Sequence, residues 1–520
     1  ASQEHVTSIV ARIRKTDDAI NQIRVIAGNA GIALGVLHYG QVIYQANYGY
    51  RDVAGGVPPD SDTVFPVGSM TKAMVSAQLA SLVEDGKVSL ETKLSELIPE
   101  YHPENNSLKL NELATEANLA DLLAHRLGLT AGNNFWSQKG QQVLVDKSET
   151  ARIVGFLQPL APFRAKFVYS NWSYGLAGEI LERLSGEGLG PLLRKSLFEP
   201  LGMLQTTLGT PGGGNVSPPA YDDSKARAGA GACKSTVNDL LKLYAAWMTA
   251  ANDQASAGRT STPGSPFKRT ALQWTAHSKI NDDSDYGLGW VLTNLPAKVG
   301  LVGVNGYEAP ELPVVAEGTK PRRLIYHQGS VCGGLSAVYL LPETETAIVV
   351  LGNSFDLCDT PDWISQVLLE AILDAQKPND YVKLAAETAC NALSHHQATI
   401  DKLAAEQEHG TKSKPLSAYI GRYFNEMGNF FLEFTVSEEH GGLTMTPQGC
   451  AQSAYDLQHY HHDVFFWPCD RDAESKQALY PQFAIGFHKV SFEVDAQENA
   501  VSCSWQIDKA IPDGETFTKK

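Results

Sequence analysis

Apolar residues near the start of the chain, and again near residue 340, follow the pattern of paired strands. Residues 31–46 hold two apolar runs of strand length on either side of a Tyr-Gly turn, which predicts a hairpin. Residues 334–351 form a second apolar hairpin, and a helix is expected after it at 363–369. Residues 4–28 have the pattern of one helix. We therefore expect strands from both ends of this region to share one antiparallel sheet flanked by helices.

Helical spacing of apolar residues prevails between the two hairpins. Loops rich in glycine and proline separate the predicted helices. The helices are expected at 72–83, 119–125, 174–184 and 237–248, and the loops at 209–219, 251–267 and 303–322. The simplest architecture is an α+β domain that carries a helical insertion.

The pattern changes in the last quarter of the chain. A polar helix at 384–408 is followed by a short segment of Gly, Lys, Ser and Pro that is typical of a linker. Beyond it, apolar residues recur with a period of two, which predicts a small antiparallel barrel or sandwich. We divide the chain into an α+β domain at 1–376, a helical linker at 377–415 and a C-terminal β-barrel-like domain at 416–520.

Composition excludes several classes of function. Of the 520 residues, 43% are hydrophobic and 19% are charged, which are ordinary values for a globular protein. The net charge of −16 and the lack of any Lys/Arg stripe argue against a nucleic-acid partner. No apolar run approaches the length of a membrane span, so a membrane partner is not expected either.

The seven cysteines are an odd number and show no C-x-x-C spacing. This favours reduced thiols over a disulfide framework and leads us to expect a cytoplasmic protein. His459 and His461 have the strand spacing that a metal pair needs, yet no third ligand accompanies them, so no metal site is expected. His395 and His396 lie on the polar linker helix and are expected to be solvated. No cofactor is predicted.

The segment Ser69-Met70-Thr71-Lys72 places a hydroxyl and an amine three residues apart at the start of a predicted helix. Residues at i and i+3 share a helix face, so Lys72 can reach the Ser69 oxygen and activate it as a nucleophile. The alternative is that Ser69 only caps the helix and Lys72 is solvated. A lysine near the positive end of the helix dipole costs stability, however, which suggests a use.

Two further segments supply groups that a serine nucleophile requires. Tyr169 and Asn171 lie two residues apart before a predicted helix, and in an extended segment they would point the same way. The alternative is that Asn171 caps that helix and Tyr169 is packed. The second segment is His327-Gln328-Gly329-Ser330, which would border the nucleophile, although a histidine before a glycine turn is more often structural.

The order of these motifs adds to their weight. S-x-x-K is followed about 100 residues later by Y-x-N and then by a basic-x-Gly strand before the final hairpin and helix. With these motifs the chain resembles the serine β-lactamase-like family, which includes class C β-lactamases, penicillin-binding DD-peptidases, D-aminopeptidases, and a group of esterases and acyltransferases. The resemblance covers roughly residues 30–376. It extends to the segments 121–129, 230–240 and 286–290.

The resemblance implies a role for each motif residue. Ser69 would be the acylated nucleophile, with Lys72 and Tyr169 as the proton-transfer pair. Asn171 would orient the lysine and the substrate carbonyl. The backbone N–H groups of Ser69 and Ser330 would form the oxyanion hole.

The strand motif departs from the pattern of the β-lactamases and DD-peptidases. Those proteins generally carry lysine where this chain has His327, and histidine is largely neutral near pH 7. Gly329 and Gly333, which follow it, are expected to border the substrate. The departure favours the esterase, D-aminopeptidase or acyltransferase branch over enzymes that recognise a carboxylate.

These residues predict a serine hydrolase or acyltransferase that forms an acyl-enzyme on Ser69. Its substrate would be a small ester, an amide or a short peptide. A β-lactamase or DD-peptidase is the first alternative. An alternative from a different class is a catalytically silent binding protein with the same fold, which the intact motif positions disfavour. The oligomeric state stays open.

Overall fold

A computed structural model describes residues 2–103, 111–211 and 222–520 of the chain. Its centre is one antiparallel eight-stranded sheet. In spatial order the strands are β2 (Gln41–Gly49), β1 (Gly31–His38), β12 (Thr346–Gly352), β11 (Gly334–Leu341), β10 (Arg322–Val331), β7 (Val291–Leu295), β6 (Ser284–Tyr286) and β5 (Ser278–Lys279). Both predicted hairpins are present, and β1 pairs with β12, so the two ends of this region meet in one sheet.

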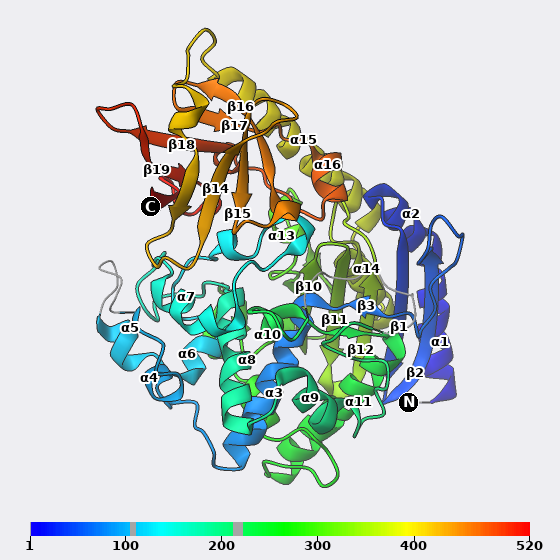
Figure 1. The fold of residues 1–520 in the computed structure, drawn as a ribbon. Coiled ribbons are helices and arrows are strands. Elements are labelled where there is room, and N and C mark those ends of the chain that lie inside the picture. Colours follow the sequence, from blue (N-terminus) through cyan, green and yellow to red (C-terminus); the bar gives the residue numbers. More distant parts are fainter. Residues whose placement is uncertain (1, 104–110, 212–221) are drawn as a thin grey trace.

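Alternate residues of β1 belong to two hydrophobic cores, one on each face of the sheet. Ile32 and Leu34 pack in the core that includes α1 (Gln3–Arg14), α2 (Asp17–Ala27) and α14 (Thr360–Leu373). Ala33 and Leu37 join the other core, beneath the helical insertion. Figure 1 shows α1 and α2 along the β1–β2 edge and the insertion on the other side of the sheet. The predicted α+β class is confirmed.

The helical insertion supplies most of the second core. Each of its predicted helices is present. The helices of this region are α3 (Thr71–Glu84), α4 (Leu94–Leu97), α5 (Asn111–Glu116), α6 (Leu119–Leu123), α7 (Thr150–Phe156), α8 (Asn171–Ser185), α9 (Leu189–Leu193), α10 (Ala228–Gly231), α11 (Val237–Ala257) and α12 (Thr270–Gln273). Outside the insertion helices and the main sheet, short elements complete the domain, namely α13 (Asn305–Glu308) and the strands β3 (Phe65–Pro66), β4 (Lys234–Ser235), β8 (Ala297–Lys298) and β9 (Val314–Val315).

Three local predictions need correction or limits. The helix predicted at 4–28 is two helices, because the chain turns at Thr16, whose N–H and hydroxyl both bond to the Ile13 carbonyl. The loop predicted at 251–267 begins later, since α11 continues to Ala257 and ends at a left-handed Gly258. Most of the loop predicted at 209–219 lies outside the described residues.

The C-terminal region forms a closed antiparallel barrel, as the period of two predicts. The long helix α15 (Tyr381–Glu406) leads to it. The barrel strands are β13 (Gly421–Phe424), β14 (Phe431–Val436), β15 (Leu443–Pro447), β16 (Tyr455–His461), β17 (Val464–Phe466), β18 (Lys489–Val494), β19 (Ala500–Trp505) and β20 (Glu515–Lys519). Tyr423, Phe434 and Phe492 stack inside it. The boundaries at 376 and 415 stay a prediction.

The barrel contacts the helical insertion directly. Hydrogen bonds join Gly140 N to Gln477 O at 2.6 Å and Gln448 Nε2 to Leu144 O at 2.9 Å. The rings of Phe135 and Phe430 meet edge to face, with 5.4 Å between their centroids. Figure 1 shows the barrel seated over α7 and α13. In the described ranges, no helix has both the length and the apolar character needed to cross a membrane.

Candidate active site

Ser69 lies in a tight turn immediately before α3. Residues Gly68–Met70 form one 3₁₀ turn, and α3 continues from Thr71. Gly68 has a φ of +52°, and a Cβ atom built on it would lie 2.8 Å from the Ser330 backbone nitrogen. Glycine is required here because the turn is left-handed and lies against β10. The turn places Ser69, which is half-buried, beside the end of that strand.

Lys72 is fully buried, so the alternative of a solvated lysine is wrong. Its Nζ lies 2.8 Å from Ser69 Oγ, 2.8 Å from Asn171 Oδ1 and 2.9 Å from the Ala230 carbonyl oxygen. Burial lowers the pKa of Lys72 well below its usual value, and the nearby Arg227 charge lowers it further. The side chain is therefore a candidate neutral base within reach of the serine.

The close approach of α8 to α10 brings the Ala230 carbonyl to the lysine. A Cβ atom on Gly229 would lie 2.3 Å from the Tyr174 carbonyl oxygen, and one on Gly175 would lie 2.6 Å from the Ala226 carbonyl oxygen. Only glycine lets the two backbones meet at this distance. The small residues of α10 thus let this helix lie against α8, which places the Ala230 carbonyl oxygen beside Lys72.

Asn171 is the first residue of α8, and its side chain does not cap the helix. That role belongs to Ser170, whose Oγ accepts the Ser173 N–H at 3.3 Å. The Asn171 amide is therefore free to accept from Lys72. The Tyr169 ring lies on the same side, with its centroid 4.9 Å from Lys72 Nζ. The structure thus brings together all four residues of the first two motifs.

His125 is a buried residue of this site to which sequence reasoning gave no role. Its ring packs on Tyr169 with 4.5 Å between centroids, and its Nδ1 accepts the Ser170 N–H at 3.0 Å. The nitrogen that accepts carries no proton, and burial lowers the pKa of His125 well below its usual value. A neutral imidazole thus positions both Tyr169 and the start of α8. The sequence signal that could have identified His125 was its place in the segment 121–129, to which the family resemblance extends.

Arg227 was also missed. It is buried, and its guanidinium carbon lies 3.9 Å from the centroid of the Trp136 ring. A permanent cation at this position disfavours a second charge on Lys72, which agrees with the direction of the lysine pKa. No spacing rule relates Arg227 to Lys72, so only the fold reveals the pair.

His327 lies on β10 and has no exposed surface. Its Nδ1 is 2.6 Å from the Gln328 carbonyl oxygen, and its Nε2 is 3.0 Å from the Tyr286 hydroxyl. A carbonyl only accepts, so Nδ1 carries the proton and Nε2 accepts from the tyrosine. Burial and the nearby Lys72 lower the pKa of His327 to about 3. The imidazole is neutral at physiological pH.

The glycines after His327 allow β10 to approach the turn that carries Ser69. A Cβ atom on Gly329 would lie 2.1 Å from the Val67 carbonyl oxygen and 2.3 Å from Ser336 Oγ. Gly333 has a φ of +84° in the turn to β11. Both glycines therefore act through the backbone. They hold the Ser330 N–H next to the Ser69 turn, the arrangement that the predicted oxyanion hole requires.

A residue of the barrel domain reaches the same place. The Tyr480 hydroxyl lies 2.8 Å from Ser330 Oγ, and it comes from the segment between α16 (Arg471–Lys476) and β18. Gln482 of that segment bonds to Ser137 of the insertion at 3.2 Å. Nothing in the sequence near Tyr480 resembles a motif, so its place could not be predicted.

Comparison with known proteins identifies the family. Residues 16–370 match the family model described as Beta-lactamase, which is more than half of the chain. The chain belongs to the Beta-lactamase family. Residues 405–519 match a second model, described as a domain of unknown function, DUF3471. Membership in the Beta-lactamase family, with hydrolases and esterases among the relatives, makes the protein an enzyme of the serine hydrolase type.

Individual relatives agree with this assignment. The unguisins hydrolase ungD of Aspergillus violaceofuscus is 26% identical over 488 residues, which cover 84% of this chain and 79% of that protein. The esterase EstB of Burkholderia gladioli is 27% identical over 210 residues, 38% of this chain and 50% of that protein. The octameric penicillin-binding protein homologue from Pyrococcus abyssi has the same fold, with a TM-score of 0.57 and 17% identity over 98% of this chain and all of that one.

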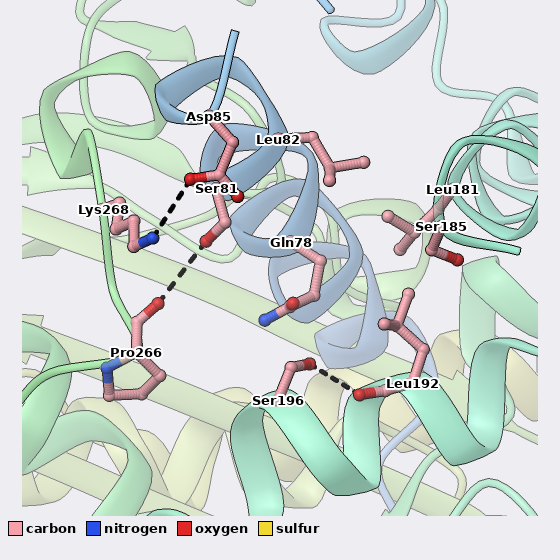
Figure 2. Close-up of a pocket in the computed structure, with 10 residues that line it drawn as sticks. All are labelled: Gln78, Ser81, Leu82, Asp85, Leu181, Ser185, Leu192, Ser196, Pro266 and Lys268. Carbon is pink, nitrogen blue, oxygen red and sulfur yellow. Dashed lines mark hydrogen bonds and ion pairs between the residues drawn. The ribbon is translucent and has the colours of Figure 1, made fainter. Parts of the chain in front are cut away.

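A separate pocket on this Beta-lactamase family fold is remote from the motif residues. Figure 2 shows it beside α3, between Leu181 and Leu192 on one side and Pro266 and Lys268 on the other. Its α3 residues begin at Gln78, nine residues beyond Ser69, or roughly 13 Å along a helix axis. It contains none of the predicted site residues and is not a candidate for the chemistry.

Gly329→Ala tests the close approach of β10 to the turn that carries Ser69. The added methyl group has no space beside the Val67 carbonyl, so the strand must move. We expect a lower melting temperature and a fall in kcat of at least tenfold, because the Ser330 N–H is displaced. Gly306→Ala is the matched control, since its Cβ would meet nothing closer than 3.9 Å and should change neither quantity. Full activity in Gly329→Ala would contradict this account.

Proposed function

We propose that this enzyme hydrolyses a small amide or ester through an acyl-enzyme on Ser69. The observation that carries the proposal is the set of three contacts around Lys72 Nζ. The Asn171 amide oxygen and the Ala230 carbonyl oxygen are both acceptors, so they take the two N–H groups of a neutral amine. Its lone pair then faces the Ser69 hydroxyl. This arrangement favours removal of the serine proton.

The proton and the acyl group can be followed through the reaction. Ser69 Oγ attacks the substrate carbonyl carbon while its proton passes to Lys72 Nζ, and the oxyanion accepts from the N–H groups of Ser69 and Ser330. Collapse of the intermediate breaks the bond to the leaving group, which receives the proton through Lys72 and Tyr169. Water then attacks the acyl-enzyme, gives up its proton by the same route, and frees Ser69. An acceptor alcohol or amine in place of water would make the reaction an acyl transfer.

The state of His327 favours neutral substrates over carboxylates. A permanent cation at this position would pair with an anionic substrate, but both nitrogens of His327 are already bonded and its pKa is about 3. An esterase, a peptide amidase or a D-aminopeptidase agrees better with this site than a β-lactamase or DD-peptidase. The relatives ungD and EstB, which are named as a hydrolase and an esterase, agree with that choice. The seven free thiols also support a reducing, cytoplasmic setting.

Covalent labelling tests the proposed nucleophile. With a fluorophosphonate or a slow ester, mass spectrometry of the intact enzyme should show one added group, located on the peptide that contains Ser69. Ser69→Ala should lower kcat by a factor on the order of 10⁴ or more with no change in melting temperature. Ser265→Ala, in the other S-x-x-K string of this chain, is the control and should keep full activity. A label on another residue would refute the mechanism.

His327→Lys tests the proposed substrate preference. The ammonium should raise kcat/KM for a carboxylate-bearing β-lactam, relative to a neutral ester, by roughly tenfold or more. His327→Gln, which stays neutral, should leave that ratio close to the wild-type value. In the wild type, His327 should cause no change in the ratio of the two kcat/KM values between pH 5 and 8. An imidazole with a pKa of about 3 stays neutral throughout that range. A wild type that prefers penicillins to esters would contradict the proposal.

Tyr480 is proposed to form one wall of the substrate site. Tyr480→Ala removes a ring beside Ser330 and should raise kcat/KM for bulky acyl esters relative to acetyl esters. Tyr480→Phe keeps the ring and loses only the hydroxyl, so it should retain the wild-type selectivity. The ratio of the two kcat/KM values is the measurement. Equal ratios in all three proteins would mean that the barrel has no part in selectivity.

A further inference from the structure

A second cluster of reactive side chains lies where the barrel meets α15, and the proposed function does not use it. Cys469 follows β17, Glu474 lies on α16, and His488 immediately precedes β18. The potential ligand atoms of these three residues all lie within 4.8 Å of one another. Cys469, Glu474 and His488 are 6%, 8% and 0% exposed, respectively. A thiol, a carboxyl and an imidazole thus converge in the interior.

His396 on α15 contacts the cluster at Cys469. Only 7% of it is exposed, and its ring nitrogens lie 3.5 and 3.7 Å from Cys469 Sγ. The expectation that His396 is solvated is therefore wrong, because α15 is amphipathic and turns this residue toward the barrel. Its neighbour His395 is exposed and bonds to Glu308 at 2.8 Å. Adjacent residues on a helix point about 100° apart, which explains the difference.

We propose that Cys469, Glu474 and His488 bind one zinc ion. Thiolate, imidazole and carboxylate groups are the ligands that Zn²⁺ takes in proteins. Zinc prefers four ligands at a tetrahedral centre, so three protein ligands leave a fourth position for water or another group. The ligand atoms of the three residues all lie within 4.8 Å of one another, so one ion can lie between them.

The hydrogen bonding of the cluster points to a cation. Within the described part of the chain, Glu474 Oε1 and His488 Nδ1 are buried and make no hydrogen bond, and they lie 3.8 Å apart. The other nitrogen of His488 faces the Gln482 carbonyl at 3.5 Å, as the outer nitrogen of a metal-bound histidine does. A divalent ion bound between Glu474 Oε1 and His488 Nδ1 would give each of them a partner.

An ion can reach this cluster from the surface. A shallow pocket between α15 and the segment before α16 is lined by both His396 and Cys469, together with Cys390, Ser394, Pro468 and Asp472. The other histidines that suggested a metal pair are differently engaged. His459 Nε2 bonds to the His462 carbonyl, and His461 Nδ1 accepts the Glu408 N–H. The sequence analysis did not single out the three zinc ligands, because Cys469, Glu474 and His488 follow no recognised metal-binding spacing.

The zinc ion would fix the segment that carries Tyr480. Glu474 and His488 flank residues 475–487, and Cys469 lies before α16. An ion bound to all three ties the two ends of this segment together. This role is structural, so the zinc site does not depend on the proposed chemistry at Ser69.

Metal analysis of the full-length enzyme tests the proposal. After treatment with a chelator and removal of the chelator, the protein should bind one Zn²⁺ per chain. Its melting temperature should rise when zinc is added. Co²⁺ in its place should give the intense thiolate-to-metal absorption of a cysteine-bound ion. Cys469→Ser should abolish that absorption and weaken zinc binding by more than the roughly 10- to 100-fold that loss of a supporting group costs. Cys450→Ser, at a half-buried thiol outside the group of three ligands, is the matched control and should bind zinc as the wild type does.

Conservative variants keep the test decisive if one protein fails to fold. Glu474→Gln and His488→Gln are conservative changes and should each lower zinc affinity while leaving fluorophosphonate labelling of Ser69 in place. Zinc bound with equal affinity by wild type and Cys469→Ser would overturn the assignment. Wild-type enzyme that binds less than one ion per chain at micromolar zinc would overturn it as well.

Discussion

The structure of the site depends on a buried lysine, Lys72, whose surroundings favour the neutral amine over the ammonium ion. Lys72 is surrounded by a hydroxyl, an amide oxygen, a carbonyl oxygen and the face of Tyr169, with Arg227 nearby. None of these groups is a carboxylate that would stabilise an ammonium ion. These neighbours come from the turn before α3 and from the starts of α8 and α10, so the three helices must meet at the lysine. The glycines of α8 and α10 then become necessary, since they let the backbone that carries one of the acceptors approach.

The sequence predicted the sheet well because both of its hairpins are local. β1 and β12 are buried on both faces, so each is a nearly continuous apolar run that is visible in the sequence without knowledge of the partner strand. The prediction of a single helix at 4–28 was wrong, because the spacing of apolar residues gives no sign of a local side-chain hydrogen bond. The Thr16 hydroxyl donates to the Ile13 carbonyl, and one helix ends there before the next begins. Local side-chain bonding of this kind competes with the helix at single residues.

The site could be predicted only where its residues form short motifs. Ser69 with Lys72, and Tyr169 with Asn171, are each within four positions of one another, so spacing alone relates them. His125, Arg227 and Tyr480 are distant in sequence from the residues that they contact. Their contributions depend on how α8, α10 and the barrel pack against one another. The buried state of His396 was missed for the same reason, because the apolar face of α15 is defined only by the barrel that covers it.

The segment between α16 and β18 has a consequence for how this enzyme can change over generations. It touches Ser330 through Tyr480, yet its ends belong to the barrel and it adds no strand to the central sheet. Insertions or deletions there alter loop length, which costs little conformational free energy. New substrate preferences can therefore arise by exchange of a few residues in the tail. The proposed acid–base residues Lys72 and Tyr169 lie outside this segment, so such changes leave them in place.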